Sequence, residues 1–553
     1  MRFLPRALHS HATLAAVVLL AQASAQNPQK QPDHVRGTVI NSATHAPIAR
    51  ALVASPDNRF ATLTDGDGRF EFEMPSANGA PIQVQYGTSD SGNTLGLSAR
   101  KPGFLAEPGI AQNSITANGE LELALTPEAI IKGRVIVPGA DGLANFNVQL
   151  FKEEVHGGRY RWQPRAMART NFNGEFRFAE LAQGVYKVFS AESMDNDPVA
   201  SPPDGQHYGF PPVYYPAAKD FADGAAIPLT AGQIVEADIP LTRQPYFPIQ
   251  IPVINAPPGF LNVTVSTLGH KSPGYTLGYS AQKQEIIGEL PTGHYVVSAN
   301  AVAQNPVVGS MNLTVAGAPA KGPAMTVIPG SSITFRVDHE FSSSAQTSPT
   351  AITRLSRFAP TGPRTYLNIT AISADDVGSE AQYSLRPPTS PQDDSMVIEG
   401  IPAGQYFLIF HPRQGYVSSA TAGGIDLLSE PLTIAAGANL QATITLRDDF
   451  VDLGISLSKS SGDPGNSPRF QNLAIIPLDG PGTFQSTQVV VGQETHIQLP
   501  PGSYRIFSLK NQDPNNLPYR DPEAMRAYES QGQVVHLSPG QKTKVQLQVS
   551  ADE

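Results

Sequence analysis

The sequence predicts an all-β chain: a tandem array of about five β-sandwich modules that follows a signal peptide. Two observations carry this prediction. A six-residue pattern, in which an aliphatic residue is followed by Gly three positions on and by Tyr two positions later, occurs four times at intervals of about 100 residues, the length of one small domain. Alternating apolar and polar residues, typical of strands, surround each copy, and no long amphipathic helix is evident.

The composition fits several small domains, each held together by its own core. The chain has 553 residues, and Gly (48) and Pro (50) are frequent enough to indicate many turns. There is no Cys, which excludes disulfides and thiolate metal sites. The formal net charge of −10 argues against a nucleic-acid partner, because nucleic acid favours a basic surface.

Residues 1–25 are expected to be a signal peptide. Arg2 and Arg6 give a positive start, "ATLAAVVLLA" is a short apolar run, and "ASA" ending at Ala25 is a small-residue cleavage site. A membrane anchor would need about 20 apolar residues, roughly twice the length of this run. We therefore expect a secreted protein, periplasmic or extracellular, whose mature chain has a linker at 26–33 and no membrane span.

The repeated pattern is typical of two strands joined by a tight turn. In its first copy, Leu181 ends one strand, Gly184 gives the turn its backbone freedom, and Tyr186 enters the next strand. A tyrosine at such a place buries its ring and donates a hydrogen bond from its hydroxyl back to the loop. We therefore take the pattern as a mark of the fold rather than of a binding site. The tyrosines expected to be buried are Tyr186, Tyr295, Tyr406 and Tyr504.

Other features recur in phase with the tyrosine pattern and define the modules. The segments that begin at Gly232, Gly437 and Gly540 alternate apolar and polar residues, so each is expected to be the last strand of a module. A short helix is expected from Asp521, the N-cap residue, with Pro522 at its first position. The expected module boundaries are 34–127, 128–245, 246–319, 320–447 and 448–553.

The first two modules resemble the carboxypeptidase regulatory-like domain family. The resemblance is carried by "GTVINSATHAPIARALV", "TDGDGRFEFEMP" and "ARKPGF" in the first module and by "GRVIVPGADGLANFNVQL" and "TNFNGEFRFAELAQGVYKV" in the second. It implies immunoglobulin-like or prealbumin-like sandwiches of the carbohydrate-binding-like fold, and it implies no peptidase activity. It covers roughly 34–245; beyond that it rests mainly on the tyrosine pattern and the last strands. Segments 214–233 and 519–541 are similar to parts of secreted multi-module acidobacterial proteins.

No motif for catalysis or metal binding stands out. None of the 12 His residues is followed by Glu at zinc-binding spacing, and neither a nucleophile elbow nor a phosphate-binding loop occurs. The segment "TDGDG" (Thr64–Gly68) invites a calcium interpretation. A hairpin turn is favoured because the matching "TNFNG" of the second module has no carboxylate. We therefore expect no enzyme, no metal and no cofactor.

Aromatic residues outside the alternating pattern are the remaining candidates for ligand binding. They lie in "HGGRYRWQPRAMA", a polar stretch between two expected strands, and in the proline-rich insert at 194–223 of the second module. Loop aromatics can stack on sugar rings. The alternative, favoured for an insert of this length, is that they pack the insert onto its module. The candidates are Tyr160, Trp162, Tyr208, Phe210, Tyr214 and Tyr215.

These observations favour a secreted, non-catalytic binding or scaffolding protein with carbohydrate as the preferred ligand class. One alternative is a structural or adhesive cell-surface rod without a small ligand. A second is a hydrolase with a site between modules. The expected partner is accordingly an extracellular polysaccharide or a cell-surface protein, and not nucleic acid.

Overall fold

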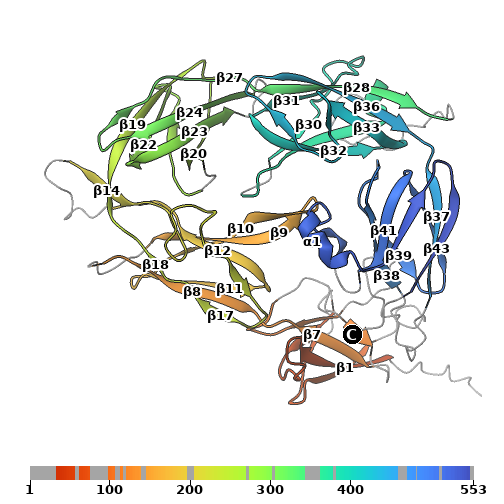
Figure 1. Ribbon diagram of the computed structural model, residues 1–553. Coiled ribbons are helices and arrows are strands. Elements are labelled where there is room, and N and C mark those ends of the chain that lie inside the picture. The colour runs from red at the N-terminus through yellow and green to blue at the C-terminus, as the bar shows by residue number, and fades with distance from the viewer. Residues whose placement is uncertain are drawn as a thin grey trace, which may run out of the picture. The chain divides into compact units, whose positions relative to one another are not determined.

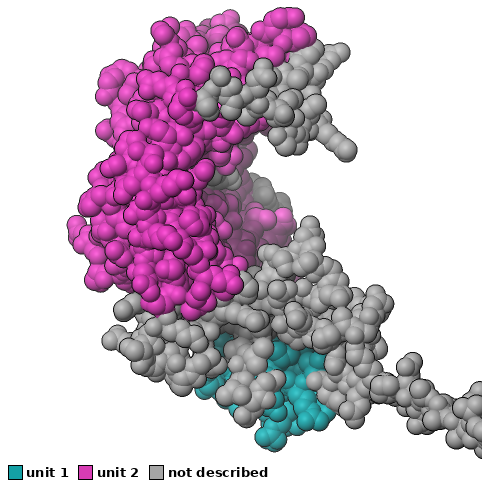
Figure 2. All heavy atoms as spheres, turned by 90° about the vertical axis from the view of Figure 1, so that its right-hand side faces the viewer, with its two compact units in different colours: residues 1–126 teal, residues 127–553 magenta. Residues whose placement is uncertain are grey.

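The computed structural model is all-β, which confirms the predicted fold class (Figure 1). Two compact units, residues 1–126 and 127–553, are coloured separately in Figure 2. No helix in the described part of the chain is long and apolar enough to cross a membrane. The expected signal peptide lies outside the described residues. These are 33–55, 61–74, 97–105, 113–115, 120–138, 145–195, 205–269, 273–301, 306–342, 361–377, 381–458, 470–480, 482–509 and 513–548.

The first unit is one sandwich. Its two sheets have the strand orders β4-β1-β7-β6 and β3-β2-β5. Valine, leucine, isoleucine and phenylalanine side chains from both sheets form its core. The strands are β1 (Asp33–Asn41), β2 (Leu52–Ala54), β3 (Ala61–Leu63), β4 (Arg69–Met74), β5 (Ser98–Arg100), β6 (Asn113–Ile115) and β7 (Leu121–Leu125).

The second unit begins with the second module. Its sheets have the orders β10-β9-β12-β15, with β16 also on β12, and β11-β8-β17, with β18 also on β8. The strands are β8 (Ala129–Ile136), β9 (Asn147–His156), β10 (Arg159–Arg169), β11 (Glu175–Leu181), β12 (Gly184–Ser190), β13 (Ser193–Met194), β14 (His207–Phe210), β15 (Val213–Tyr214), β16 (Ile227–Leu229), β17 (Ile234–Glu236) and β18 (Ile239–Pro240).

The third module receives two strands from the insert of the second. Its larger sheet has the order β13-β14-β19-β22-β21, with β25 and β26 on β19, and its smaller sheet the order β20-β23-β24-β27. The sheets of this module thus extend to Pro329, because β25 to β27 pair with its strands. These strands are β19 (Gln244–Ile254), β20 (Asn262–Thr267), β21 (Gly278–Ser280), β22 (Glu285–Pro291), β23 (Gly293–Ala301), β24 (Val307–Val315), β25 (Ala320–Lys321), β26 (Met325–Thr326) and β27 (Ile328–Pro329).

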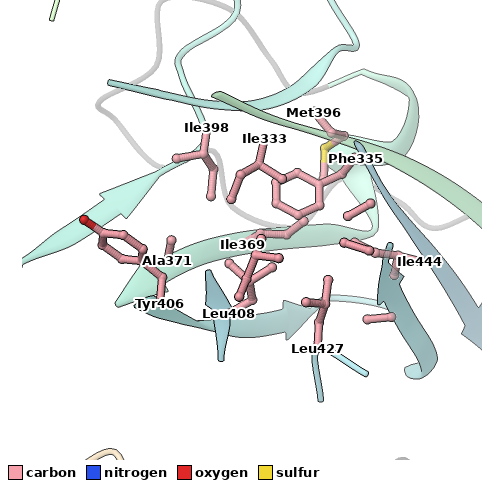
Figure 3. Packing of buried hydrophobic residues seen from close by; sticks show 14 of the residues in the cluster. Ile333, Phe335, Ile369, Ala371, Met396, Ile398, Tyr406, Leu408, Leu427 and Ile444 are labelled. Atoms are coloured by element: carbon pink, nitrogen blue, oxygen red, sulfur yellow. The ribbon is translucent and has the colours of Figure 1, made fainter. Parts of the chain in front are cut away.

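The fourth module has the sheets β31-β28-β36-β33-β34 and β30-β29-β32-β35. Figure 3 shows its core, in which side chains of both sheets interdigitate and the Tyr406 hydroxyl lies at the margin. Its elements are β28 (Ser331–Glu340), the 3-10 helix η2 (Gly362–Thr365), β29 (Leu367–Ser373), β30 (Gln382–Ser384), β31 (Met396–Ile401), β32 (Gly404–Pro412), β33 (Tyr416–Ala422), β34 (Ile425–Asp426), β35 (Leu432–Ile434) and β36 (Asn439–Arg447).

The fifth module has the sheets β40-β37-β43 and β39-β38-β41-β42. The expected short helix is present as α1, and the Asp521 side chain accepts hydrogen bonds from the N–H groups of Glu523 and Ala524. The elements are β37 (Val451–Ser458), β38 (Phe470–Pro477), β39 (Gln485–Val490), β40 (Glu494–Leu499), β41 (Gly502–Ser508), η3 (Pro514–Asn516), α1 (Pro522–Met525), η4 (Arg526–Tyr528), β42 (Gln533–Leu537) and β43 (Lys542–Gln548).

All five modules repeat one strand pairing. In each, the first strand pairs in parallel with a strand near the end of the module and antiparallel with a second neighbour. The parallel partner includes the last strand in four modules; in the third it is β25 and β26, which precede β27. The segments that begin at Gly232, Gly437 and Gly540 contain these last strands, as expected. All three glycines have a positive φ, between 68° and 77°, which few other residues adopt without strain. The last strand of a module is therefore entered through a glycine turn.

The four tyrosines of the repeated pattern occupy equivalent buried places. Tyr186, Tyr295, Tyr406 and Tyr504 are 0%, 2%, 5% and 0% exposed. Each lies two residues into its strand, and each hydroxyl donates to the carbonyl oxygen four residues earlier, at 2.7 to 3.0 Å. The acceptor carbonyls belong to the turn that precedes the strand. Each tyrosine therefore ties its turn to the core, and the prediction that the pattern marks the fold is confirmed.

In the third and fourth modules, the glycine of the pattern makes room for the tyrosine ring. Residues two apart on a strand point to the same face, so the ring leans back over the glycine. A Cβ atom at Gly293 would lie 2.8 Å from the Tyr295 hydroxyl oxygen, and one at Gly404 would lie 3.3 Å from the Tyr406 ring. In these two copies the spacing of Gly and Tyr thus has a steric cause.

Candidate functional site: the β9–β10 hairpin and the aromatic insert

The two aromatic residues of the "HGGRYRWQPRAMA" segment lie on a strand and not in a loop. Tyr160 and Trp162 belong to β10, which pairs with β9 over its whole length in a long antiparallel hairpin. Gly157 and Gly158 form the two-residue turn at its tip, with φ of 57° and 81°. Positive φ at both central positions is the geometry of tight turns that match strand twist. The expected polar connection is therefore a rigid element that projects from the sandwich.

The insert covers the outer face of the sheet that contains the hairpin. Phe151 on β9 and Phe189 on β12 point away from the main core and pack with Tyr214 and Phe221 of the insert in a second small core. The Phe189–Tyr214 and Phe151–Phe221 ring centroids are 4.9 and 5.2 Å apart. Trp162 packs on the edge of this cluster, 5.8 Å from Phe221. Packing of the insert onto its module thus explains why Tyr214 is buried and why Trp162 is partly buried.

The other candidates of the insert lie in three different settings. Phe210 is buried in the main core of the second module and meets Phe146 edge to face at 5.3 Å. Tyr215 is half-buried against the same core. Tyr208 is half-buried on β14, with the Arg243 guanidinium 4.0 Å above its ring. Together with Tyr160, which is 43% exposed, the six candidates do not form one continuous aromatic surface.

Lys187 on β12 is buried beneath the insert. Its Nζ donates to the carbonyl oxygens of Phe221 and Ala222 at 2.7 and 3.2 Å and lies 5.1 Å from the centre of the Trp162 ring. Burial lowers the pKa of Lys187, and the nearby carboxylate of Glu153 opposes this shift. Lys187 is buried because the insert covers the outer face of β12. Lys187 compensates by satisfying carbonyl groups of the insert.

The hairpin also contacts the fourth module. The backbone N–H of Trp162 donates to the Asp376 carbonyl at 2.7 Å, and the Arg161 guanidinium donates to the Ser373 carbonyl at the same distance. Arg161 is only 1% exposed, an unusual degree of burial for an arginine. Val377 pairs with Trp162 across a parallel bridge and packs on the second small core. Backbone of the fourth module thus pairs with β10, the edge strand of a sheet of the second module.

The tip of the hairpin contacts the fifth module. The Arg520 N–H donates to the Gly158 carbonyl at 2.8 Å, and the Tyr519 ring lies against Gly158 so closely that a Cβ atom there would be 2.6 Å away. Arg159 lies 4.2 Å above the ring of Phe407, a residue of the fourth module. Figure 1 shows the hairpin end beside α1. Three modules far apart in sequence therefore meet at one hairpin.

Sequence reasoning found the aromatic residues of this region but missed the residues that hold it. Arg161, Lys187 and Gly158 carried no signal, because a buried arginine or lysine looks like an exposed one in sequence. The alternation Arg159-Tyr160-Arg161-Trp162 does indicate a strand with two faces. It could not indicate that both faces would be covered, one by the insert and the other by a module that begins over 150 residues later.

The "TDGDG" segment forms a hairpin turn. The Asp65 carboxylate accepts hydrogen bonds from the N–H groups of Asp67 and Arg69 at 2.9 and 2.8 Å. Asn171 in the second module accepts the same two bonds, from Asn173 and Glu175, at 3.0 and 2.9 Å. The oxygen atom, and not the negative charge, is what the turn uses.

We expect Asp65→Asn to change the stability of the first module by less than about 0.5 kcal/mol, because the amide oxygen preserves both hydrogen bonds. Asp65→Ala should cost about 1 kcal/mol, the usual value of a lost cap. Thermal unfolding with and without EDTA measures both effects. A calcium-dependent loss of several degrees in Asp65→Asn alone would instead show that the carboxylate binds metal.

Comparisons with known proteins show similarity to solved structures alone. No family model matches the chain, and no curated protein matches it. The Bacillus anthracis TIE protein is 12% identical, with 74% of this chain and 70% of that chain covered and a TM-score of 0.14. The Streptococcal ancillary pilin is 7% identical, with 56% and 100% covered and a TM-score of 0.18. At such low scores these similarities say nothing about what this chain binds.

Proposed function

We propose that this chain is a non-catalytic structural protein that acts outside the cell, a scaffold whose modules are fastened to one another. The observation that carries the proposal is the docked β9–β10 hairpin. It uses Trp162, the only tryptophan of the chain, and the buried Arg161 for contacts within the molecule. A chain of independent binding modules would not need such contacts. The apolar signal-like segment at the start supports an extracellular location.

Two other features support a fastened scaffold. The insert of the second module contributes β13 and β14 to a sheet of the third, so these two modules share one sheet. The connection between the fourth and fifth modules is held by Asp449, whose carboxylate accepts hydrogen bonds from Tyr416 at 2.6 Å and from Arg447 at 3.0 Å. The junction between the second and third modules and the junction between the fourth and fifth modules thus have specific polar contacts, which limit the freedom of these modules.

The resemblance of residues 34–245 to the carboxypeptidase regulatory-like family is compatible with this proposal, since that family name denotes a non-catalytic accompanying domain. Carbohydrate binding stays a prediction. The aromatic surface available to a sugar is smaller than the sequence suggested, because Phe210 and Tyr214 are buried. Phe210 and Tyr214 are 7% and 1% exposed and offer no face to a sugar. A carbohydrate site would have to use Tyr160, Tyr208 and Tyr215, which are exposed or half-buried.

The test uses the full chain. In a calorimetric scan we expect residues 127–553 to unfold in fewer transitions than their four modules, because the hairpin and the shared sheet couple them. Titration with a broad oligosaccharide panel should leave the fluorescence of Trp162 unchanged. Four separate transitions would contradict a fastened scaffold. Saturable sugar binding that is lost in Tyr160→Ala or Tyr208→Ala would favour the carbohydrate-binding alternative.

A further inference from the structure

The joint between the second and third modules contains a pair of half-buried carboxylates, Glu192 and Glu289. Glu192 follows β12 and reaches the third module, where the Thr276 N–H donates to its Oε2 at 3.0 Å and the Gly274 carbonyl accepts from its backbone N–H at 3.2 Å. Glu289 on β22 holds His207 of β14, with 2.6 Å between Oε1 and Nδ1. Glu192 and Glu289 are near enough to repel each other. Acidic side chains therefore form part of the contact between the two modules.

These carboxylates are incompletely satisfied. Oε1 of Glu192 and Oε2 of Glu289 are buried and have no hydrogen-bond partner among the described residues. The hydroxyl of Tyr246, a fully buried residue on β19, lies near Glu192 but without hydrogen-bond geometry. No Lys or Arg of the described ranges forms an ion pair with Glu192. A buried carboxylate in such a setting is costly when charged, and a proton removes that cost.

Among the residues that the structure describes, the surroundings of Glu192 contain no cationic side chain that would balance its charge strongly. Besides Glu289, its neighbours are the phenols of Tyr246, Tyr275 and Tyr295, and the carboxylate of Asp220 in the insert contributes to raising the pKa of Tyr275. His207 faces Glu289. Burial, and to a smaller degree Glu289, raise the pKa of Glu192 to about 7, against the lowering effect of the hydrogen bond from the Thr276 N–H.

We propose that this joint is a pH-sensitive element: it is tight while Glu192 carries a proton and loosens when Glu192 ionises. Opening the joint hydrates Glu192 and returns its pKa to the ordinary value of a glutamate. The closed joint therefore binds a proton more strongly than the open one. Its stability is complete below the pKa of a free glutamate, about 4.5, falls as the pH rises to about 7, and is constant above that. One proton changes the opening equilibrium at most about tenfold per pH unit.

Hydrogen–deuterium exchange of the full chain from pH 5 to 8, corrected for the intrinsic pH dependence of exchange, tests the proposal. In the natural protein, protection of peptides from β14 and β19 should fall with rising pH up to about 7, whereas peptides from β37 and β43 should not change. Glu192→Gln, a permanently uncharged mimic, should keep the low-pH protection throughout. Glu285→Gln, which removes a carboxylate elsewhere on β22, should behave like the natural protein.

A second variant keeps the proposal testable even where Glu192→Gln does not fold. Glu289→Gln removes the repelling charge, so the pH at which protection falls should move downward. The proposal is overturned if β14 and β19 show no pH dependence in the natural protein. It is also overturned if Glu192→Gln folds and retains the dependence of the natural protein. Neither result would affect the scaffold proposal, which rests on the hairpin and not on Glu192.

Discussion

Tyr186→Ala is expected to lower the free energy of unfolding of the second module by about 3–5 kcal/mol, the cost of truncating a fully buried aromatic side chain. Tyr186 is 0% exposed and its hydroxyl bonds to the Ala182 carbonyl at 2.7 Å. Truncation therefore leaves a cavity and an unpaired turn carbonyl together. A typical domain has only about 5–15 kcal/mol of stability, so this one change removes a large part of it. Denaturant unfolding of the full chain, monitored by hydrogen exchange of peptides from β12, measures the loss.

Two further variants separate the contributions. Tyr186→Phe keeps the ring and removes only the hydroxyl, so it should cost about 1 kcal/mol. Phe172→Ala truncates an aromatic of the same module that is 82% exposed, and it should stay within about 0.5 kcal/mol of the natural protein. Equal losses in Tyr186→Ala and Phe172→Ala would show that the tyrosine is not the anchor of its turn.

Gly158→Ala is expected to detach the hairpin tip from the fifth module. The added Cβ atom would lie 2.6 Å from the Tyr519 ring, which cannot yield without breaking the Arg520 N–H bond to the Gly158 carbonyl. Such overpacking typically costs about 1–3 kcal/mol. The opening equilibrium of the docked tip should then rise roughly 5- to 150-fold at about 1.4 kcal/mol per factor of ten. Limited proteolysis of the tip and the fluorescence of Trp162 report the opening.

Gly157→Ala is the matched control. Gly157 has a φ of 57° and Gly158 a φ of 81°, so alanine is strained at either position. No atom lies within 4 Å of the position of a Cβ at Gly157, so this variant carries the backbone strain without the collision. The difference between the two variants is the contribution of docking. If both variants open equally, the tip contact does not hold the hairpin.

Local patterns predicted the repeated parts of the fold well. The tyrosine pattern and the glycine-led last strands are determined within a few residues, by strand alternation and by turn geometry, and both were found where expected. The β13–β14 pair was not predictable from such patterns. Its strands have only two and four residues, and their partner β19 begins with Gln-Pro, in which proline cannot donate a ladder hydrogen bond.

The candidate site could be predicted only in part, for a different reason. Trp162 and the aromatic residues of the insert stand out by composition, and their grouping in the second module is visible in the sequence. Their role depends on what covers them. The covering residues, such as Asp376 and Tyr519, lie in modules more than 200 residues away and have no sequence pattern that links them to β10. A surface of one module in isolation therefore looks like a binding face.

Where the first and last strands of a module pair in parallel, as in the fourth and fifth modules, this pairing determines how the module would resist tension. Because the two strands run in the same direction side by side, the chain enters a module at one end of the sheet and leaves it at the other. Pulling on both ends slides the strands along each other, and their ladder of hydrogen bonds must break together rather than one at a time. β28 and β36 share a ladder of nine residue pairs, from Ser332 to Glu340. The fourth module is therefore built to transmit force along the chain before it unfolds.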